Sequence, residues 1–479
     1  MIPEIRMNAL VGMRVHLVGV KGAGMAALAE ILVKAGALVS GSDTEEVFFT
    51  DGVLEQAGIA PLVGFSAEHL DENTSLIIYS TAYDPKKNPE LVSAATRNIP
   101  ILSYPEAVGL LTKEKLSLLV TGTHGKTTTS ALLAEVLRKG GLDPSAIIGG
   151  RVRDWKGNAL SGTGTYFVLE ADEYQNKLPH YAPFAVILTS VDWDHPDFFP
   201  DFESYKRVFA EFVRRIPRHG VLVYCNDSAA VTEIAKEAIC EKRSYGFHED
   251  SDFVIRNHET IEASEGDREG EKQQFDIFSE GISLGRFSLR LAGKHNAQNA
   301  TAVVALARWL KVPKDAIAHG LASFLGTSRR FEYIGERNGA LVYDDYAHHP
   351  EELRATLAAF RALYPDRRLT AIFHPHTFSR TKALLSEFSQ SFDMADRVLV
   401  LPVYGSARET EKSVSSADLV EEINRYVPLK AEFMENIKAV VEELEGSMGK
   451  EDLIVTFGAG NVWEIGIKLV RKNSRDHKK

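Results

Sequence analysis

Hydrophobic and polar positions follow one repeating order along the chain. A short apolar run comes first, then a turn rich in glycine or polar residues, and then a segment whose apolar residues lie three or four positions apart. Apolar runs of this kind are typical of buried strands, and the wider spacing is typical of helices with one buried face. Strands that alternate with helices indicate parallel sheets with helical crossovers, so the pattern predicts an α/β fold.

The first block of this order lies near the amino terminus. A strand is predicted at 14–20, a helix at 25–36 and a second strand at 37–41. Gly36 is expected to end the helix, because glycine adopts the left-handed backbone conformation that terminates many helices.

Two further blocks repeat the order. The second begins near Leu116 with a strand, a loop and a helix that ends at Gly140 and Gly141, and the third runs from a strand at 340–346 to a helix that ends near 470. Three blocks in 479 residues predict three domains. The expected domains are 1–114, 115–327 and 328–479, with linkers near 112–116 and 326–332.

Composition excludes several classes of protein. The chain is 44% hydrophobic and 25% charged, which excludes disorder over most of its length. The 55 Lys and Arg against 66 Asp and Glu give a net charge of −11, which disfavours nucleic acid as a partner. No apolar run is long enough to cross a bilayer and no signal peptide is evident, so we expect a cytoplasmic protein without a membrane partner. Cys225 and Cys240 give neither a disulfide framework nor a thiolate zinc site, and both are expected in the core.

Two polar segments are expected to lie on the surface. The stretch 262–274 reads EASEGDREGEKQQ and is predicted to be an exposed hairpin tip or loop. The end of the chain, 468–479, is rich in lysine and is expected to fray.

The strongest chemical signal is a phosphate-binding loop at 121–129, TGTHGKTTT. A strand that leads through glycines into a helix beginning with Lys-Thr presents backbone N–H groups to phosphates. Lys126 would neutralise the phosphates and Thr127 would ligate magnesium. Val120 stands where the general phosphate-loop pattern has a glycine, so the alternative is an ordinary tight turn.

A second signal is acidic and follows two predicted strands. Glu170, Asp172 and Glu173 end one strand, and Asp194 and His195 follow the next, together with Asp192. Ligands of α/β sheets collect at these strand ends, and carboxylates beside a phosphate loop suit Mg²⁺ on a nucleotide. The alternative is that the acidic residues cap the following helices.

A glycine turn follows the first predicted strand. Gly19, Gly22 and Gly24 lie in GVKGAGM, and Asp43 ends the next strand. The spacing is G-x-x-G-x-G instead of the dinucleotide fingerprint, so it favours some phosphate-bearing ligand at a helix amino terminus. An NAD-dependent oxidoreductase is the alternative from another class, but it gives GKTTT and EADE no role.

The third block concentrates groups that bind anions. Asp344, Asp345, Tyr346, His348 and His349 are followed by His374, His376, Ser379 and Arg380. Zinc is disfavoured because no cysteine accompanies the histidines, so we expect the fork of donors on Arg380 to recognise a carboxylate. A nucleotide-driven switch, a further alternative, leaves this cluster unexplained.

Taken in order, these motifs resemble the Mur ligase family across nearly the whole chain. The resemblance rests on GVKGAGMAALAEIL, TGTHGKTTT, EADE, the DH at 194–195, GKHNAQNA at 293–300, SRRFE, DDYAHHP and HPHTFSRT. It implies a Rossmann-like amino-terminal domain, a central ATPase-like domain and a Rossmann-like carboxy-terminal domain.

The resemblance also implies roles for individual residues. Lys126, His195 and Arg330 would be catalytic, and Thr127, Glu173 and His195 would hold the metal. The nucleotide would contact Gly122, Thr123, His124, Gly125, Lys126, Thr127, Thr128, His295, Asn299, Arg330 and Asp345. The UDP-sugar would contact Gly22, Ala23, Gly24, Met25, Ser42, Asp43, Ser80 and Thr81. The amino acid would contact Tyr346, His348, His376 and Arg380.

The implied reaction is ATP- and Mg²⁺-dependent. The resemblance implies that the lactyl carboxylate of UDP-N-acetylmuramate attacks the γ-phosphate of ATP, and that the amine of L-alanine then displaces phosphate from the acyl phosphate. This reaction belongs to peptidoglycan precursor synthesis. The enzyme is expected to be a monomer or a homodimer. EADEY, with Tyr174 and Gln175, is more familiar from the ligase that recycles murein tripeptide, whereas HPHTFSRT favours alanine.

Lys21 is expected either to contact phosphate or to be exposed, and Lys206 is a candidate for carbamylation.

Overall fold

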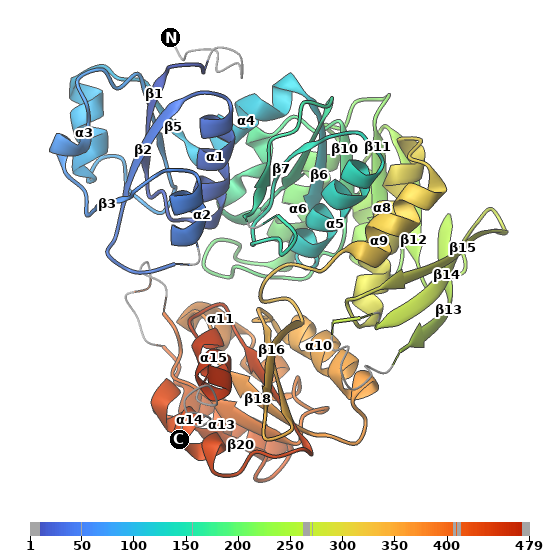
Figure 1. Ribbon diagram of the computed structural model, residues 1–479. Helices are drawn as coiled ribbons and strands as arrows, with labels where there is room; N and C mark the ends of the chain where they lie inside the picture. The colour runs from blue at the N-terminus through green and yellow to red at the C-terminus, as the bar shows by residue number, and fades with distance from the viewer. Residues whose placement is uncertain are drawn as a thin grey trace, which may run out of the picture. The chain divides into compact units, whose positions relative to one another are not determined.

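The computed structural model describes residues 10–48, 50–155, 157–261, 269–270, 272–405, 409 and 413–471. These residues form two compact units, coloured along the chain in Figure 1. The first unit contains Met1–Val191, Lys206–Phe253 and Ala300–Leu321, and the second contains Asp192–Tyr205, Val254–Asn299 and Ala322–Lys479. Most of the expected surface stretch 262–274 and the end of the chain from 472 lie outside the described residues.

The first unit begins with a five-stranded parallel sheet in the order β3-β2-β1-β4-β5. The predicted helix between its first two strands is present, and Gly36 with φ +91° follows its end. The elements are β1 (Arg14–Val18), α1 (Ala23–Lys34), β2 (Leu38–Asp43), α2 (Asp51–Gln56), β3 (Leu62–Val63), η2 (Ala67–His69), β4 (Leu76–Tyr79), α3 (Pro89–Thr96), β5 (Ile101–Ser103) and α4 (Tyr104–Glu114).

The central part of the chain adds strands in the order β12-β11-β10-β6-β9-β7-β8 to the first unit. All but the β7–β8 pair are parallel, and β10 is buried along its whole length, as a strand covered on both faces must be. The elements are β6 (Leu116–Thr121), α5 (Lys126–Lys139), β7 (Ser145–Ile147), β8 (Ala159–Leu160), β9 (Tyr166–Glu170), η3 (Tyr174–Asn176), η4 (Leu178–His180), β10 (Ala185–Leu188), α6 (Phe202–Val213), β11 (Val221–Cys225), α7 (Ala229–Ala235), β12 (Glu241–Gly246), α8 (Lys294–Trp309) and α9 (Lys314–Ser323).

The second unit holds a six-stranded sheet in the order β16-β17-β21-β18-β19-β20 and the strands β13, β14 and β15. Pairs β14–β15 and β16–β17 are antiparallel hairpins, which the predicted order of parallel strands and helical crossovers does not include. The elements are β13 (Phe253–Thr260), β14 (Gln273–Ser279), β15 (Ile282–Leu289), β16 (Glu332–Arg337), β17 (Ala340–Asp345), α10 (Pro350–Leu363), β18 (Arg368–Phe373), α11 (Phe378–Ala383), α12 (Leu385–Ser389), β19 (Arg397–Val400), α13 (Ser416–Tyr426), β20 (Ala431–Phe433), α14 (Ile437–Glu445), β21 (Asp452–Phe457) and α15 (Trp463–Arg471).

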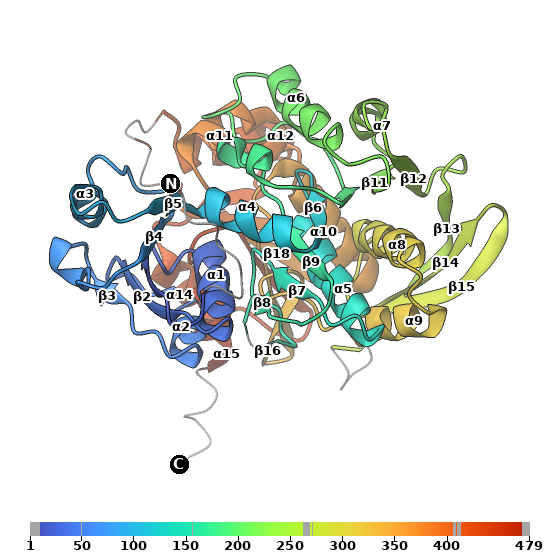
Figure 2. The same ribbon diagram turned by 90° about the horizontal axis from the view of Figure 1, so that it is seen from above.

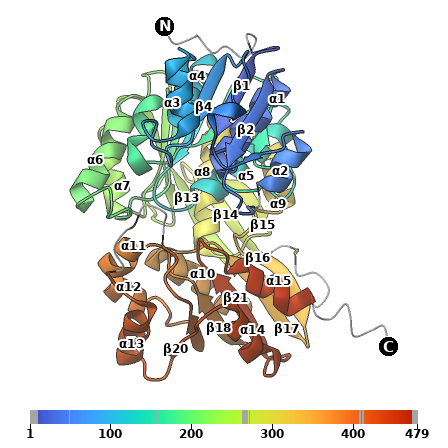
Figure 3. The same ribbon diagram turned by 90° about the vertical axis from the view of Figure 1, so that its left-hand side faces the viewer.

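Helices cover both faces of the six-stranded sheet (Figure 3). Ala340 and Val342 of β17 pack in the cluster formed with α14 and α15, whereas Leu341 and Tyr343 pack in the cluster formed with α10 and α13. Successive side chains of a strand point to opposite faces, so one apolar run supplies both cores.

Cys225 and Cys240 are both buried, as expected of core residues. No helix among the described residues combines the length and the apolar character that a bilayer crossing needs.

Gly109 allows α4 to approach the short helix η4 of the first unit. A Cβ atom at this position would lie 2.4 Å from the carbonyl oxygen of His180, whereas a Cβ at Gly52 in α2 would have no atom within 4 Å. Since backbone cannot yield as a flexible side chain does, Gly109→Ala should destabilise the fold by about 1–3 kcal/mol.

Thermal and urea unfolding of the Gly109→Ala variant, measured in parallel with the Gly52→Ala control, tests whether position 109 requires glycine. The control should be neutral or stabilised by about 0.5–1 kcal/mol, because alanine favours an exposed helix. Equal unfolding midpoints for Gly109→Ala and the unchanged protein would contradict the close approach.

Candidate active site

The predicted phosphate loop joins the buried strand β6 to helix α5. Gly122 has φ +131° and Gly125 has φ +77°, values that favour glycine. A Cβ at Gly122 would also lie 2.4 Å from Oγ1 of Thr189. Thr189 and Ser190, at the end of β10, hold the loop from the side, and the N–H groups of Thr123 and His124 donate to Ser190. The glycines are therefore needed for the shape of this loop.

Lys126, the first residue of α5, is 14% exposed and has its ammonium group inside the loop. Its Nζ donates to the carbonyl oxygen of Thr123 at 3.0 Å and to Oε2 of Glu173 at 3.1 Å, as well as to Gly122 O. Burial disfavours the charge, but the carboxylates of Glu173, Asp172 and Glu170 outweigh it and raise the pKa of Lys126. The ammonium is thus charged and fixed where phosphates would meet it.

The predicted acidic residues of the first unit lie beside this loop. Thr127 Oγ1 donates to Glu170 Oε1 at 2.8 Å, and the N–H of Gly149 donates to Glu170 Oε2 at 2.6 Å. Asp172 forms an ion pair with Lys177. A hydroxyl and several carboxylates of this kind are hard oxygen donors, which suit Mg²⁺.

His195 lies in the second unit with φ +55°, a left-handed conformation that is uncommon for residues other than glycine. Its N–H donates to Asp194 Oδ1 at 2.6 Å, and its carbonyl oxygen accepts from the N–H groups of Phe198 and Phe199, both at 2.9 Å. The surrounding turn therefore fixes the orientation of this histidine.

The glycine turn after β1 is held by Asp43. Its carboxylate accepts from the N–H of Lys21 at 2.7 Å, from the N–H of Thr44 at 2.8 Å and from the Tyr83 hydroxyl at 3.0 Å. Burial and the Asp43 carboxylate raise the pKa of Tyr83 above its usual value. Through these three hydrogen bonds, Asp43 holds the glycine turn in place. A contact with a ligand would be additional to this structural role.

Lys21 is buried, so the expectation that it is exposed is wrong, whereas the expected phosphate contact stays a prediction. Its side chain is 8% exposed, and Nζ lies 3.1 Å from Asp51 Oδ1 and donates to the carbonyl oxygen of Glu46 at 2.8 Å. Lys21 therefore ties the segment after β2 to the glycine turn.

The other residues predicted for the UDP-sugar lie at or next to the carboxyl ends of β1, β2 and β4. Met25 is buried in α1, and a Cβ at Gly24 would lie 2.6 Å from the Tyr104 ring. The Ser42 hydroxyl donates to the buried Glu90 at 2.6 Å, so it faces the interior. Thr81 Oγ1 donates to Gln175 Oε1 at 2.8 Å.

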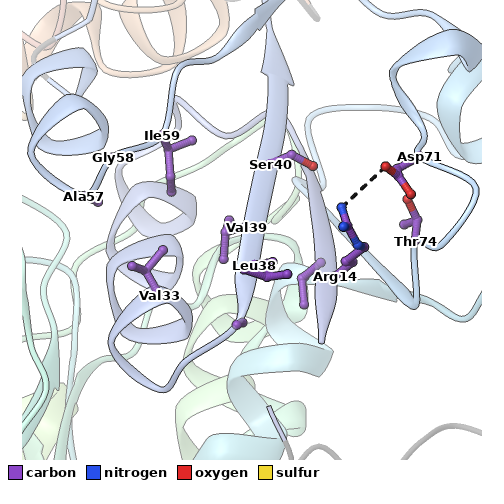
Figure 4. Close-up of a pocket in the computed structure, with 12 residues that line it drawn as sticks. Arg14, Val33, Leu38, Val39, Ser40, Ala57, Gly58, Ile59, Asp71 and Thr74 are labelled. Atoms are coloured by element: carbon purple, nitrogen blue, oxygen red, sulfur yellow. Dashed lines mark hydrogen bonds and ion pairs between the residues drawn. The ribbon is translucent and has the colours of Figure 1, made fainter. Parts of the chain in front are cut away.

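A hollow of about 310 Å³ lies at the opposite, amino-terminal edge of this sheet (Figure 4). Arg14, Leu38 and Ser40 line it, together with Asp71, which pairs with Arg14 at 3.4 Å. Ligands of parallel α/β sheets bind at the carboxyl ends of strands, so this hollow is not the predicted site.

In the second unit, Arg380 forms a buried ion pair with Asp194. Arg380 Nε lies 2.8 Å from Asp194 Oδ1, and the second contact, from the NH2 group to Oδ2, is 3.3 Å. Burial disfavours both charges, but the attraction between the Arg380 guanidinium and the Asp194 carboxylate outweighs it. The pKa of Asp194 therefore lies well below its usual range, and the pKa of Arg380 is raised. Among the described residues, the NH1 group of Arg380 makes two long contacts of 3.4 Å, both to His376, so this edge can accommodate another acceptor.

Aromatic rings surround this ion pair. The ring centres of His348 and His376 are 6.2 Å apart, and those of Tyr346 and His348 are 5.2 Å apart. Burial lowers the pKa of His348 to about 3 and, with the Arg380 charge, that of His376 to about 4. Both imidazoles are therefore neutral at pH 7, so the positive charge of the cluster lies on arginine.

Asp345 ends β17 and binds two backbone N–H groups, that of Phe331 at 2.7 Å and that of Ala347 at 2.9 Å. Burial raises the pKa of Asp345 to about 6 despite the nearby Arg330. The Arg330 guanidinium lies 5.1 Å from the centre of the Tyr346 ring. Asp345 thus brings the SRRFE and DDYAHHP motifs together.

His295 and Asn299 lie on the first turns of α8. Gly293, with φ +96°, precedes them, and a Cβ there would lie 2.6 Å from the His295 ring. Asn299 Nδ2 donates to Asn296 Oδ1 at 3.2 Å. The GKHNAQNA motif therefore forms a helix start with its polar side chains packed together.

Arg329 shapes the site in the second unit and has no role predicted from the sequence. It forms a 2.8 Å ion pair with Asp344 and donates to the carbonyl oxygens of the 458–460 turn. The adjacent arginines in SRRFE are the only signal for Arg329 in the sequence. Asp194, predicted beside nucleotide-bound magnesium, pairs with Arg380, and no local pattern indicates this pairing.

Three family models match the chain in succession. The model described as Mur ligase family, catalytic domain, matches 14–116; Mur ligase middle domain matches 120–307; and Mur ligase, glutamate ligase domain, matches 329–460.

Relatives match over nearly the whole length. UDP-N-acetylmuramate–L-alanine ligase from Desulfitobacterium hafniense is 39% identical over 460 residues, covering 96% of this chain and 99% of the relative. The enzyme of the same name from Carboxydothermus hydrogenoformans is 37% identical, covering 96% of each chain.

Solved structures agree with these matches. UDP-N-acetylmuramate-alanine ligase from Thermotoga maritima superposes with a TM-score of 0.81 at 25% identity, covering 96% of this chain and 99% of that one. A murein peptide ligase from Psychrobacter arcticus, with a TM-score of 0.69 at 24% identity over 96% and 98%, shares the fold. With three consecutive family models and relatives that match from end to end, the chain belongs to the Mur ligase family.

Proposed function

We propose that this Mur ligase joins L-alanine to the lactyl carboxylate of UDP-N-acetylmuramate at the expense of ATP, in peptidoglycan precursor synthesis. The full-length relatives named for this reaction support the choice of substrates. The geometric observation that carries the proposal is the charged, largely shielded Lys126 at the start of α5, inside a glycine-shaped loop beside Glu173.

The nucleotide site in this proposal is the loop from Gly122 to Thr128. The helix start supplies N–H groups and Lys126 supplies a fixed positive charge, both of which stabilise phosphates. Resemblance adds His295, Asn299, Arg330 and Asp345 to this site.

Magnesium is part of the proposal because the donors beside the loop fit it. Thr127 and Glu173 would hold the ion, and His195 is added on the resemblance. When bound, Mg²⁺ neutralises charge on the triphosphate.

The UDP-sugar is proposed to bind at the carboxyl ends of β1, β2 and β4. Gly22, Ala23, Gly24 and Met25 begin α1, whose amino terminus favours phosphate groups. Ser42, Asp43, Ser80 and Thr81 lie at or next to the neighbouring strand ends. The interior position of the Ser42 hydroxyl means that its contribution would come through its backbone.

The amino acid is proposed to bind at the cluster of Tyr346, His348, His376 and Arg380. The NH1 edge of Arg380 suits the carboxylate of alanine, because the opposite edge is already taken by Asp194. The neutral imidazoles of His348 and His376 add no positive charge beside the amino group of alanine.

The reaction follows in two steps. A carboxylate oxygen of the muramyl lactyl group attacks the γ-phosphorus, and ADP leaves with the electrons of the bond that breaks. The amine of alanine then attacks the acyl carbon, loses a proton and displaces inorganic phosphate. Lys126 lowers the repulsion between the carboxylate and the triphosphate, which is the main barrier to the first step.

The proposal keeps the domains expected from the sequence, 1–114, 115–327 and 328–479. Because ATP and nucleotide-activated sugars are cytoplasmic metabolites, it includes a cytoplasmic location. Either a monomer or a homodimer is compatible with the reaction.

Substrate dependence of phosphate release tests the proposed function. ATP with UDP-N-acetylmuramate should release phosphate on addition of L-alanine and not on addition of L-Ala-γ-D-Glu-meso-diaminopimelate. Lys126→Ala, the control for contaminating activity, should lower the rate by at least about 100-fold. Stimulation by the tripeptide alone would instead identify a recycling ligase.

The Arg380→Lys variant tests the proposed alanine site. Arg380→Ala would leave Asp194 as an uncompensated buried charge, so Arg380→Lys is the sharper variant. It keeps the charge but loses the second edge of the guanidinium, so the KM for alanine should rise about tenfold or more while the KM for ATP changes less than about threefold. Equal changes in both constants would remove Arg380 from the alanine site.

A further inference from the structure

Two polar side chains of the first unit join the residues proposed for the UDP-sugar to those proposed for ATP. Asn158 lies at the start of β8 and is fully buried, and Gln175 lies in η3 after EADE. Figure 2 shows α1 beside β7 and β8, the elements that Asn158 connects. The sequence analysis gave no role to Asn158.

Asn158 makes the first bridge. Its Nδ2 donates to the carbonyl oxygen of Ala23, which begins α1, at 2.8 Å, and to the carbonyl oxygen of Ile148 at 2.9 Å. Both partners are acceptors, so the orientation of the amide group is fixed. In the described part of the chain, Asn158 Oδ1 is buried without a hydrogen-bond partner, a cost that the two donated bonds must offset.

The bridge continues from Ile148 to the phosphate loop. Gly149 follows Ile148, and its N–H donates to Glu170 Oε2, while Glu170 Oε1 accepts from Thr127 Oγ1. A Cβ at Gly149 would lie 2.8 Å from the Glu170 carboxylate, so a larger residue here would displace that carboxylate from this position. The Asn158 contact is thus linked to Thr127 through the peptide bond between Ile148 and Gly149 and through the Glu170 carboxylate.

Gln175 makes the second bridge. Its Oε1 accepts from the Thr81 hydroxyl at 2.8 Å, beside the carboxyl end of β4. Gln175 has φ +57°, and Glu173, two residues earlier, is bonded to Lys126. A strained residue persists where surrounding contacts fix it, and Thr81 supplies such a contact.

We infer that Asn158 and Gln175 are positioning residues through which UDP-sugar binding at Ala23 and Thr81 strengthens nucleotide binding at Lys126 and Thr127. This inference rests on the proposed function. A ligand that fixes the start of α1 and the end of β4 also fixes the Ala23 carbonyl oxygen, which Asn158 contacts, and the Thr81 hydroxyl, which Gln175 contacts. The two bridges in turn orient Glu170 and Glu173. By linkage, ATP strengthens UDP-sugar binding by the same factor.

Calorimetric titration of the full chain with Mg²⁺ and a non-hydrolysable ATP analogue measures the coupling. The ratio of its Kd without and with saturating UDP-N-acetylmuramate should be about 5 to 150 for the unchanged protein. Asn158→Ala, Asn158→Asp and Gln175→Ala should each lower this ratio at least about threefold. The Kd for each ligand alone should change less than about twofold.

A matched control separates coupling from stability. Asn424 of the second unit also bridges backbone groups, with two bonds of 2.8 Å to Ala431. Asn424→Ala should lower the melting temperature and leave the ratio unchanged. If Asn158→Ala does not fold, Gln175→Ala decides the matter.

Three results would overturn the inference. A ratio near 1 in the unchanged protein, with both ligands bound, would remove the coupling but keep the proposed function. An unaltered ratio in both Asn158→Ala and Gln175→Ala would remove the two residues from it. Absence of binding by either ligand would remove the proposed function itself.

Discussion

The ammonium group of Lys126 is largely shielded from solvent, and a shielded charge needs compensation from groups already in place. Two loop carbonyl oxygens and the Glu173 carboxylate give that compensation. An uncompensated buried ion would cost several kcal/mol, so the loop and the end of β9 cannot move independently. The glycines at 122 and 125, the contact with Ser190 and the carboxylates after β9 all serve this arrangement.

The second unit meets the same physical requirement with different residues. Arg380 is buried against Asp194, and the neighbouring histidines are kept neutral by burial. In each unit a fixed cation, Lys126 or Arg380, is matched by a carboxylate from another segment. Fixed cations suit a reaction in which anionic groups must approach one another, because no reorganisation is needed when charge develops.

Local patterns predicted the strand–loop–helix around Lys126, the helix end at Gly36 and the burial of both cysteines, because each depends on neighbouring residues. The hairpins β14–β15 and β16–β17 were missed, since an apolar run has the same pattern in either strand direction. The ion pairs of Lys21 and Asp194 were not predicted for a different reason. Lys21 pairs with Asp51 and Asp194 pairs with Arg380, and no local pattern indicates a partner that lies elsewhere in the chain.

The acyl phosphate is the central chemical claim, and oxygen isotope transfer tests it most directly. UDP-N-acetylmuramate with ¹⁸O in both lactyl carboxylate oxygens is turned over with ATP and L-alanine, and the released phosphate is analysed by mass spectrometry. Attack of the carboxylate on the γ-phosphorus predicts one ¹⁸O atom in each phosphate, because the bridging oxygen leaves with phosphorus. Phosphate without ¹⁸O would contradict the account.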